Sequence, residues 1–313
     1  MNHQSHLRNP RRRSGQRSRQ RRSTAVVAAG VAALLTLAGC STPAPASDPS
    51  AAAVQVKPSV ASVTPTTASV SQQRTVTITG RDLSQVKTVE FGSVPAKVRA
   101  VDSPAAGSTA TIKVTAPPAV DFQSGPVTIT LKNAKGKVVA AKDDVYSYAA
   151  KTGVDKQLQY AMTYWQNYNT AQYGDLNSVG GDCANFVSQT LVARGWPMTD
   201  EWYNHDAAAD WSPAWGYVPA MDEYFAQNAA QLGLQELSFD QRDKVALGDV
   251  AIFDWDNDGS PDHTQIVTAI KKVNGVIKIE MASHNDDGPY RDLDELITQQ
   301  HPGATGHFWH LTR

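Results

Sequence analysis

The sequence has few cysteines and no long apolar run, and both shortages limit what the protein can be. Its 313 residues include two cysteines, which excludes a disulfide-rich scaffold. The longest apolar stretch, Ala25–Gly39, has fifteen residues and is interrupted only by Thr36. This is shorter than the ~20 residues that a membrane-spanning helix needs. With 41% hydrophobic residues, the chain is long enough for two globular domains and is neither wholly disordered nor collagen-like.

Acidic residues are missing from residues 1–39, which contain eight arginines and no lysine. The whole chain has 29 Lys and Arg against 30 Asp and Glu, so without this segment 21 bases face 30 acids, a net charge of −9. An acidic mature chain argues against a general nucleic-acid binder, because a phosphate backbone favours clustered Lys and Arg. The sequence also contains no motif that reads RNA or DNA, and we expect no nucleic-acid partner.

The N-terminus has the pattern of a bacterial export signal. An Arg-rich stretch up to Arg22 precedes the apolar core, which is typical of a cleaved signal peptide. The core ends in Leu37-Ala38-Gly39-Cys40, which resembles a lipobox and implies lipid attachment to Cys40 after removal of residues 1–39. Residues 40–53 predict a flexible linker, so the protein is expected on the outer face of the cytoplasmic membrane. An ordinary signal with an incidental cysteine is the alternative, and the export route, Sec or Tat, stays open.

Residues 54–150 predict a small β-sandwich. Alternating apolar and polar residues recur in short runs separated by turn residues. The segment resembles the IPT/TIG immunoglobulin-like module along nearly its whole length, with Gln72-Gln73 where family members often have two glycines. We interpret it as a spacer, with ligand binding as the alternative. The expected strands are residues 74–79, 88–91, 111–114, 126–131 and 144–148.

Residues 153–313 contain all seven tryptophans and the residues that favour catalysis. Residues 157–168 predict a first helix, and GGDCANFVSQTLVARG (180–195) predicts a second, with Asp182 as N-cap and Gly195 as its end. Cys183 then lies in the first turn, where backbone N–H groups lower a thiol pKa. Because Cys40 is assigned to lipid, Cys183 has no disulfide partner. A reactive nucleophile is therefore favoured, with an inert buried thiol as the alternative.

A nucleophilic cysteine needs a base from elsewhere in the fold. Residues 247–255, 264–270 and 276–285 predict three antiparallel strands, with His263 at the start of the second and His284 at the end of the third. Adjacent strands of this kind can bring the two histidines side by side, so that His284 orients the ring of His263. Asn285 could serve the same role.

Three motifs together resemble a known family: GGDCANFVSQTLVARG, LGDVAIFDWDNDGSPDHTQIVTAI and MASHNDDGPYRDL. They look like the papain-like amidase domain of secreted bacterial proteins, a relative of the CHAP and NlpC-type peptidoglycan hydrolases. The resemblance implies an α+β domain with Cys183 as nucleophile, His263 as base and His284 or Asn285 as third member. The expected fold class is multidomain, an immunoglobulin-like β-sandwich followed by an α+β papain-like cysteine hydrolase domain.

Two further features extend this interpretation. Tyr173 could donate its hydroxyl to the oxyanion, with a structural tyrosine as the alternative.

Asp254, Asp256 and Asp258 stand at positions 1, 3 and 5 of a loop like the start of a calcium-binding EF-hand, although position 12 is Gln265. We expect either an ordinary polar turn or a structural calcium site, and no required cofactor.

The sequence therefore predicts an exported, lipid-anchored cysteine amidase or endopeptidase. Its expected partners are the membrane, through the anchor, and cell-wall peptides, most plausibly those of peptidoglycan, and it is expected to be a monomer. A non-catalytic wall-binding or adhesion lipoprotein is one alternative. An acyltransferase that uses the same cysteine and histidine is another.

Overall fold

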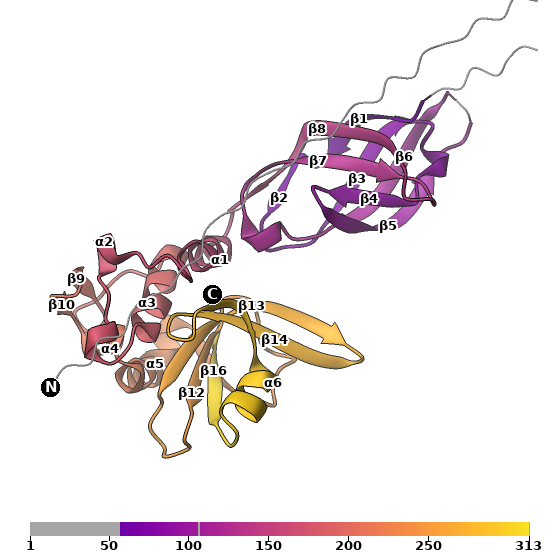
Figure 1. Ribbon diagram of the computed structural model, residues 1–313. Helices are drawn as coiled ribbons and strands as arrows, with labels where there is room; N and C mark the ends of the chain where they lie inside the picture. Colours follow the sequence, from indigo (N-terminus) through magenta and orange to yellow (C-terminus); the bar gives the residue numbers. More distant parts are fainter. Residues whose placement is uncertain (1–56, 106, 313) are drawn as a thin grey trace, which may run out of the picture. The chain divides into compact units, whose positions relative to one another are not determined.

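A computed structural model describes residues 57–105 and 107–312 (Figure 1). The expected signal peptide, the lipidation site at Cys40 and the linker lie outside this range. Within it, no helix combines the length and the apolar character needed to span a bilayer.

The N-terminal part of the described chain consists of β-strands around one apolar core. In β3 (Arg74–Arg81), Val76, Ile78 and Gly80 are buried while the residues between them are more exposed, which is the period-2 pattern that a sheet with one covered face requires. The strands are hydrogen-bonded in the order β1-β3-β6-β5-β4-β7-β8-β2. The others are β1 (Ser59–Thr64), β2 (Thr67–Ser69), β4 (Thr88–Phe91), β5 (Val94–Asp102), β6 (Thr109–Ala116), β7 (Gly125–Lys132) and β8 (Val138–Ala149).

All five runs expected as strands in this part are strands in the structure, as β3, β4, β6, β7 and β8. The sequence missed β1, β2 and β5. In β5 only one residue is fully buried, Ala96, so the apolar alternation that marks a half-buried strand is weak.

The C-terminal part combines a sheet with several helices. The six-stranded sheet has the order β11-β16-β12-β13-β14-β15, and Figure 1 shows α3 and α5 beside it. Its strands are β11 (Leu234–Ser238), β12 (Val250–Asp254), β13 (His263–Val273), β14 (Val276–Ser283), β15 (Gly288–Asp292) and β16 (Thr305–Leu311), and a small hairpin is formed by β9 (Asn204–Asp206) and β10 (Asp210–Trp211). The helices are α1 (Gly153–Tyr164), α2 (Thr170–Tyr173), α3 (Cys183–Arg194), α4 (Pro213–Gly216), α5 (Val218–Leu232) and α6 (Leu293–Glu295).

Local signals explain where the two main helices begin and end. Helix α1 begins one turn before the expected Gln157, because the Thr152 side chain accepts a hydrogen bond from the Asp155 N–H and the Asp155 carboxylate accepts one from the Thr152 N–H. Helix α3 begins at Cys183 and ends at Arg194, where Gly195 follows as the C-cap, with φ 117° in the left-handed conformation that favours glycine.

The register of β12 against β13 sorts side chains between the two faces of the sheet. Ile252 pairs with Thr264, and Phe253 pairs with His263. Ile252 belongs to the apolar cluster that contains Cys183, whereas Phe253 belongs to a different cluster. Since successive residues of a strand point to opposite faces, Thr264 faces the side of Cys183 and His263 faces the other side.

Candidate active site

Cys183 is the first residue of α3 and is 6% exposed. Two glycines before it, Gly180 and Gly181, have φ values of 127° and 128°, a backbone conformation that other residues rarely adopt. A Cβ on Gly181 would also lie 3.1 Å from Oδ1 of Asn285. The Gly-Gly pair therefore lets the chain turn tightly into the helix beside the end of β14.

A cavity of about 300 Å³ has Cys183 in its wall. One side is formed by the glycine turn before α3, and another by Trp211 and Tyr217. Asp262, immediately before β13, closes a third side. Trp211 is one of three tryptophans in residues 202–215, and the other two, Trp202 and Trp215, are buried in the core.

The thiol of Cys183 is harder to ionise than the sequence suggested. Burial raises its pKa to about 11, and the charge of Asp182 acts in the same direction. Backbone N–H groups of Thr264 and Ala184 bond the sulfur and lower the pKa, but by less than burial raises it. The expected lowering at a helix start is therefore outweighed, and the thiol is protonated at neutral pH in this structure.

The ring of His263 does not meet the sulfur. It lies 5.5 Å from the ring of Trp255 and 6.4 Å from that of Phe253, on the face of the sheet that looks away from Cys183. The expected cysteine–histidine contact is thus not formed. The physical reason is that successive side chains of β13 alternate between the two faces of the sheet, and Thr264, not His263, points to the face that carries α3. The backbone of the 263–264 peptide nevertheless borders the sulfur, through the Thr264 N–H.

The environment of His263 favours the neutral imidazole. Burial lowers its pKa to about 3, and the nearby charges of Arg291 and His301 lower it further. Its Nε2 atom is buried and has no hydrogen-bond partner among the described residues. A neutral ring with an unpaired nitrogen can accept a proton.

His284 has partners other than His263. Its Nδ1 lies 2.6 Å from Oδ2 of Asp182, and its Nε2 lies 2.8 Å from the carbonyl oxygen of Tyr164. The ring is fully buried. This differs from the expectation that His284 orients the His263 ring, because both nitrogens are already occupied on the Cys183 side of the sheet.

Asn285 and Tyr173 also lie beside the cysteine turn without touching His263. The Asn285 side chain accepts the N–H of Asp182 at 2.5 Å and donates to Asn177. Tyr173 is buried in the cluster that contains Cys183, and its hydroxyl accepts a hydrogen bond from Gln172 at 3.0 Å. A role for either one in catalysis stays a prediction.

The acidic loop after β12 has a different composition from the expected calcium loop. Asp254, Asp256 and Asp262 bring carboxylate oxygens within 4.8 Å of one another, whereas Asp258 accepts the N–H of Ser260. Asp254 also accepts the N–H groups of Asp258 and Gly259, at 3.2 and 2.8 Å. These bonds account for a well-formed polar turn.

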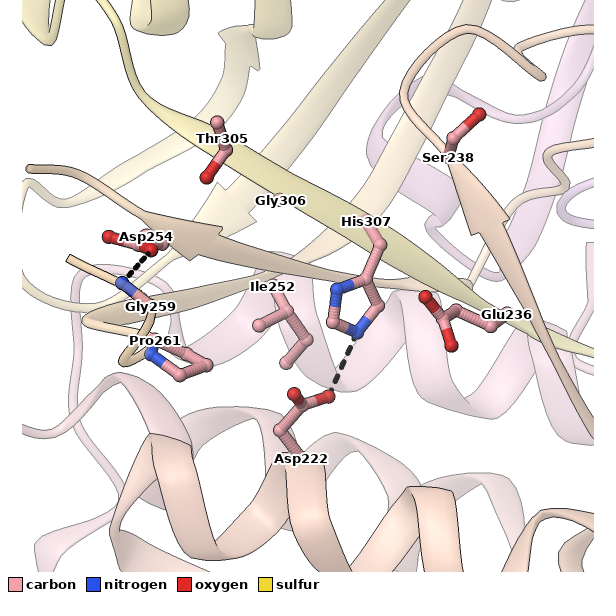
Figure 2. A pocket seen from close by; sticks show the side chains of 10 residues that line it. All are labelled: Asp222, Glu236, Ser238, Ile252, Asp254, Gly259, Pro261, Thr305, Gly306 and His307. Carbon is pink, nitrogen blue, oxygen red and sulfur yellow. Dashed lines mark hydrogen bonds and ion pairs between the residues drawn. The ribbon is translucent and has the colours of Figure 1, made fainter. Parts of the chain in front are cut away.

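A second cavity, of about 360 Å³, adjoins this loop (Figure 2). Pro261 lines both this cavity and the one at Cys183. Figure 2 shows His307 on β16 directed at Asp222 on α5, with Nε2 2.9 Å from Oδ1. Because Asp222 lies 85 residues away in the sequence, no local pattern marks this pair.

The chain thus has a β-rich domain followed by a domain of helices and strands. The second domain contains one cysteine, Cys183, at the start of a helix. The chain belongs to the family described as "Putative amidase domain", which matches residues 148–309, and residues 58–148 match the IPT/TIG domain. The second match fits the immunoglobulin-like fold of the N-terminal part, and the first supports a hydrolase that acts on amides.

Two curated relatives are uncharacterized proteins of Bacillus subtilis (strain 168). YhbB is 31% identical over 123 residues, which is 37% of this chain and 37% of YhbB. YjcM is 33% identical over 154 residues, 47% of this chain and 31% of YjcM. The chain thus spans about a third of the length of each relative.

Among solved structures, the chain resembles auxiliary nutrient binding proteins of two Bacteroides species. That of Bacteroides ovatus ATCC 8483 has a TM-score of 0.21 and 18% identity, over 30% of this chain and 21% of its own. The protein of Bacteroides thetaiotaomicron VPI-5482 has a TM-score of 0.20 and 15% identity, over 29% of this chain and 21% of its own. Likenesses this low carry no argument about function.

Proposed function

We propose that this protein is a cysteine amidase in which the thiol of Cys183 attacks the amide carbonyl. The observation that carries the proposal is the placement of Cys183. It is the free cysteine of the described chain, stands at the start of α3 in a cavity wall and receives backbone N–H groups on its sulfur. A helix start of this kind supports a thiolate and then the oxyanion of a tetrahedral intermediate.

His263 is the proposed base. Two observations support it: the peptide that follows it touches the sulfur, and its Nε2 has no partner among the described residues. Burial lowers the pKa of His263 to about 3, so the ring must leave this environment before it takes the proton of the thiol. His284 is a poorer candidate because both of its nitrogens are engaged. Because His263 points to the face of the sheet away from Cys183, the proposal requires the backbone at the start of β13 to rearrange, so that the ring reaches the sulfur when substrate fills the cavity.

The protonation states then define the mechanism. With the thiol protonated and the imidazole neutral, the proton moves from sulfur to His263 as the sulfur attacks, without a preformed ion pair. The C–N bond breaks, the leaving amine takes the proton from the imidazolium, and a thioester remains on Cys183. Water, deprotonated by His263, hydrolyses the thioester and restores both groups.

We further propose that the substrate is a peptide amide of cell-wall peptidoglycan. We also propose that the domain is papain-like and related to the CHAP and NlpC-type hydrolases. The Arg-rich signal pattern and the Cys40 motif support export and lipid anchoring at the outer face of the cytoplasmic membrane. The acidic balance after residue 39 supports the absence of a nucleic-acid partner. The proposed protein acts as a monomer without a required cofactor, and calcium would at most stabilise the turn before His263.

Two observations favour a second candidate, a wall-binding lipoprotein without turnover. The thiol is buried and protonated, and the His263 ring lies on the other face of the sheet. Mass spectrometry of wall fragments incubated with the purified full-length protein separates the candidates. Fragments that gain water indicate hydrolysis, fragments joined to an amine indicate acyl transfer, and unaltered fragments indicate binding alone.

A further inference from the structure

Asp182 and His284 form a buried pair beside the nucleophile. Their side chains are 1% and 0% exposed, and Nδ1 of His284 lies 2.6 Å from Oδ2 of Asp182. Asp182 is the residue immediately before Cys183, yet its carboxylate does not cap α3. Its backbone N–H is bonded to Asn285, so two consecutive residues at the end of β14 hold it.

The hydrogen-bond partners fix how many protons the pair holds. Nε2 of His284 faces the carbonyl oxygen of Tyr164, which can only accept, so Nε2 carries a hydrogen. Nδ1 faces a carboxylate oxygen at 2.6 Å, and this bond also requires a proton. The other oxygen of Asp182 accepts two further N–H donors, Leu176 N and Asn185 Nδ2, both at 2.8 Å. A carboxylate that accepts three hydrogen bonds favours its ionised form, which leaves the proton on Nδ1.

Aromatic rings on both sides of His284 favour a positive ring. Tyr168 stacks at 3.5 Å between ring centroids with an interplanar angle of 1°, and Phe186 stacks at 4.1 Å on a separate element. The negative faces of aromatic rings attract a cation, more strongly where water is excluded.

We propose that His284 is a positioning residue that carries a fixed positive charge and neutralises Asp182, so that the carboxylate beside Cys183 does not oppose ionisation of the thiol. This inference rests on the proposed role of Cys183 as nucleophile and gives His284 a role that does not involve His263. It accounts for the stacked, fully buried ring and for a carboxylate placed next to a sulfur that must become negative.

Charges around the site agree with this role. The charge of Asp182 raises the pKa of Cys183. A positive charge on the His284 ring, whose Nδ1 lies 2.6 Å from the carboxylate, acts in the opposite direction. Other ionisable groups nearby include Tyr160, whose pKa is raised by burial and also by the charge of Asp182, and Tyr164, whose carbonyl oxygen bonds His284. Two further carboxylates are Asp287, bonded to the Tyr168 hydroxyl, and Asp262 in the wall of the cavity. Neither of these carboxylates bonds His284.

The test measures alkylation of Cys183 by iodoacetamide at pH 8 in the full-length protein, read by mass spectrometry of the peptide that contains Cys183. The His284→Asn variant keeps an N–H donor for Asp182 but removes the positive charge of the ring. We expect the alkylation rate to fall about tenfold, which corresponds to a rise of about one unit in the pKa of Cys183. Adding Asp182→Asn to this variant removes the carboxylate charge that His284 no longer offsets and should restore the rate to within about threefold. The matched control is His205→Asn, which changes an exposed histidine 3.6 Å from Asp210 and should leave the rate unchanged.

Two results would overturn the inference. One is a folded His284→Asn variant, by far-UV circular dichroism, that alkylates at the wild-type rate. The other is a double variant that stays as slow as the single one, because that outcome means a purely structural role. If His284→Asn does not fold, ¹⁵N NMR of the wild-type protein decides, since the inference requires both His284 nitrogens to be protonated. Activity of a Cys183→Ala variant would instead refute the proposed function and leave these results standing.

Discussion

Burial of Cys183 has a measurable consequence for its reactivity. Only the thiolate reacts with an alkylating reagent, so the rate follows the ionised fraction. With a pKa of about 11, roughly one thiol in 10⁴ is ionised at pH 7, whereas an ordinary thiol with a pKa of about 8.5 is about 3% ionised. Without substrate, Cys183 should therefore react about 300-fold more slowly than an ordinary thiol at pH 7.

The assay is a pH series of iodoacetamide labelling, again read on the Cys183 peptide, with the urea-unfolded protein as the control for an unperturbed thiol. The folded protein should show a rate that keeps rising tenfold per pH unit beyond pH 9. The unfolded control should level off above about pH 8.5. A folded-state rate that levels off below pH 8 would refute the reasoning, because it would mean that the helix start and the N–H donors outweigh burial.

Four further outcomes are expected. His263→Ala should lower kcat by about 10²–10⁴-fold in an assay of wall-peptide cleavage, as loss of a general base does; an unchanged kcat removes His263 from the mechanism. Trp215→Phe should lower the free energy of unfolding by about 1–3 kcal/mol in urea titrations, because Asn185 loses its 2.7 Å bond from the indole N–H; a smaller loss means that water replaces the donor. Asp294→Asn should lower the free energy of unfolding by less than about 1 kcal/mol at pH 7, because its side chain is 28% exposed and solvent screens the ion pair. The hydrogen bond from Arg242 lowers the pKa of Asp294 from 3.8 to about 2. The stability that the ion pair contributes is therefore complete above pH 3.8 and lost as the pH falls through 2. If the wild type and the variant still differ in free energy of unfolding at lower pH, the ion pair is not the cause. Removing divalent metals with EDTA should leave activity unchanged, and a loss that calcium restores would assign the Asp254 loop a metal.

The local features of the fold were predictable from the sequence. The start of α3 at Cys183, its end before Gly195 and the start of β13 at His263 follow from patterns within a few residues. The beginning of α1 was wrong by one turn, because the Thr152 capping box lies before the apolar periodicity begins. Features encoded within about ten residues are thus accessible without the fold.

The arrangement of the site was less accessible. The sequence placed His263 at the start of a strand, but its face depends on the register against β12, which pairs it with Phe253. The partner of His284 is Asp182, which lies 102 residues away on a different element. The net effect on the Cys183 pKa depends on burial, which the helix-start argument did not include. Each of these requires tertiary packing that no local pattern specifies.

The most direct test of the central claim is the release of soluble fragments from purified cell wall by the full-length wild-type protein and its Cys183→Ala variant. The wild-type protein should release fragments and the folded Cys183→Ala variant should release none, while a Cys40→Ala variant, assayed in the same detergent, should match the wild type. Equal release by wild type and Cys183→Ala would contradict the account, because the sulfur at the start of α3 would then not be the nucleophile.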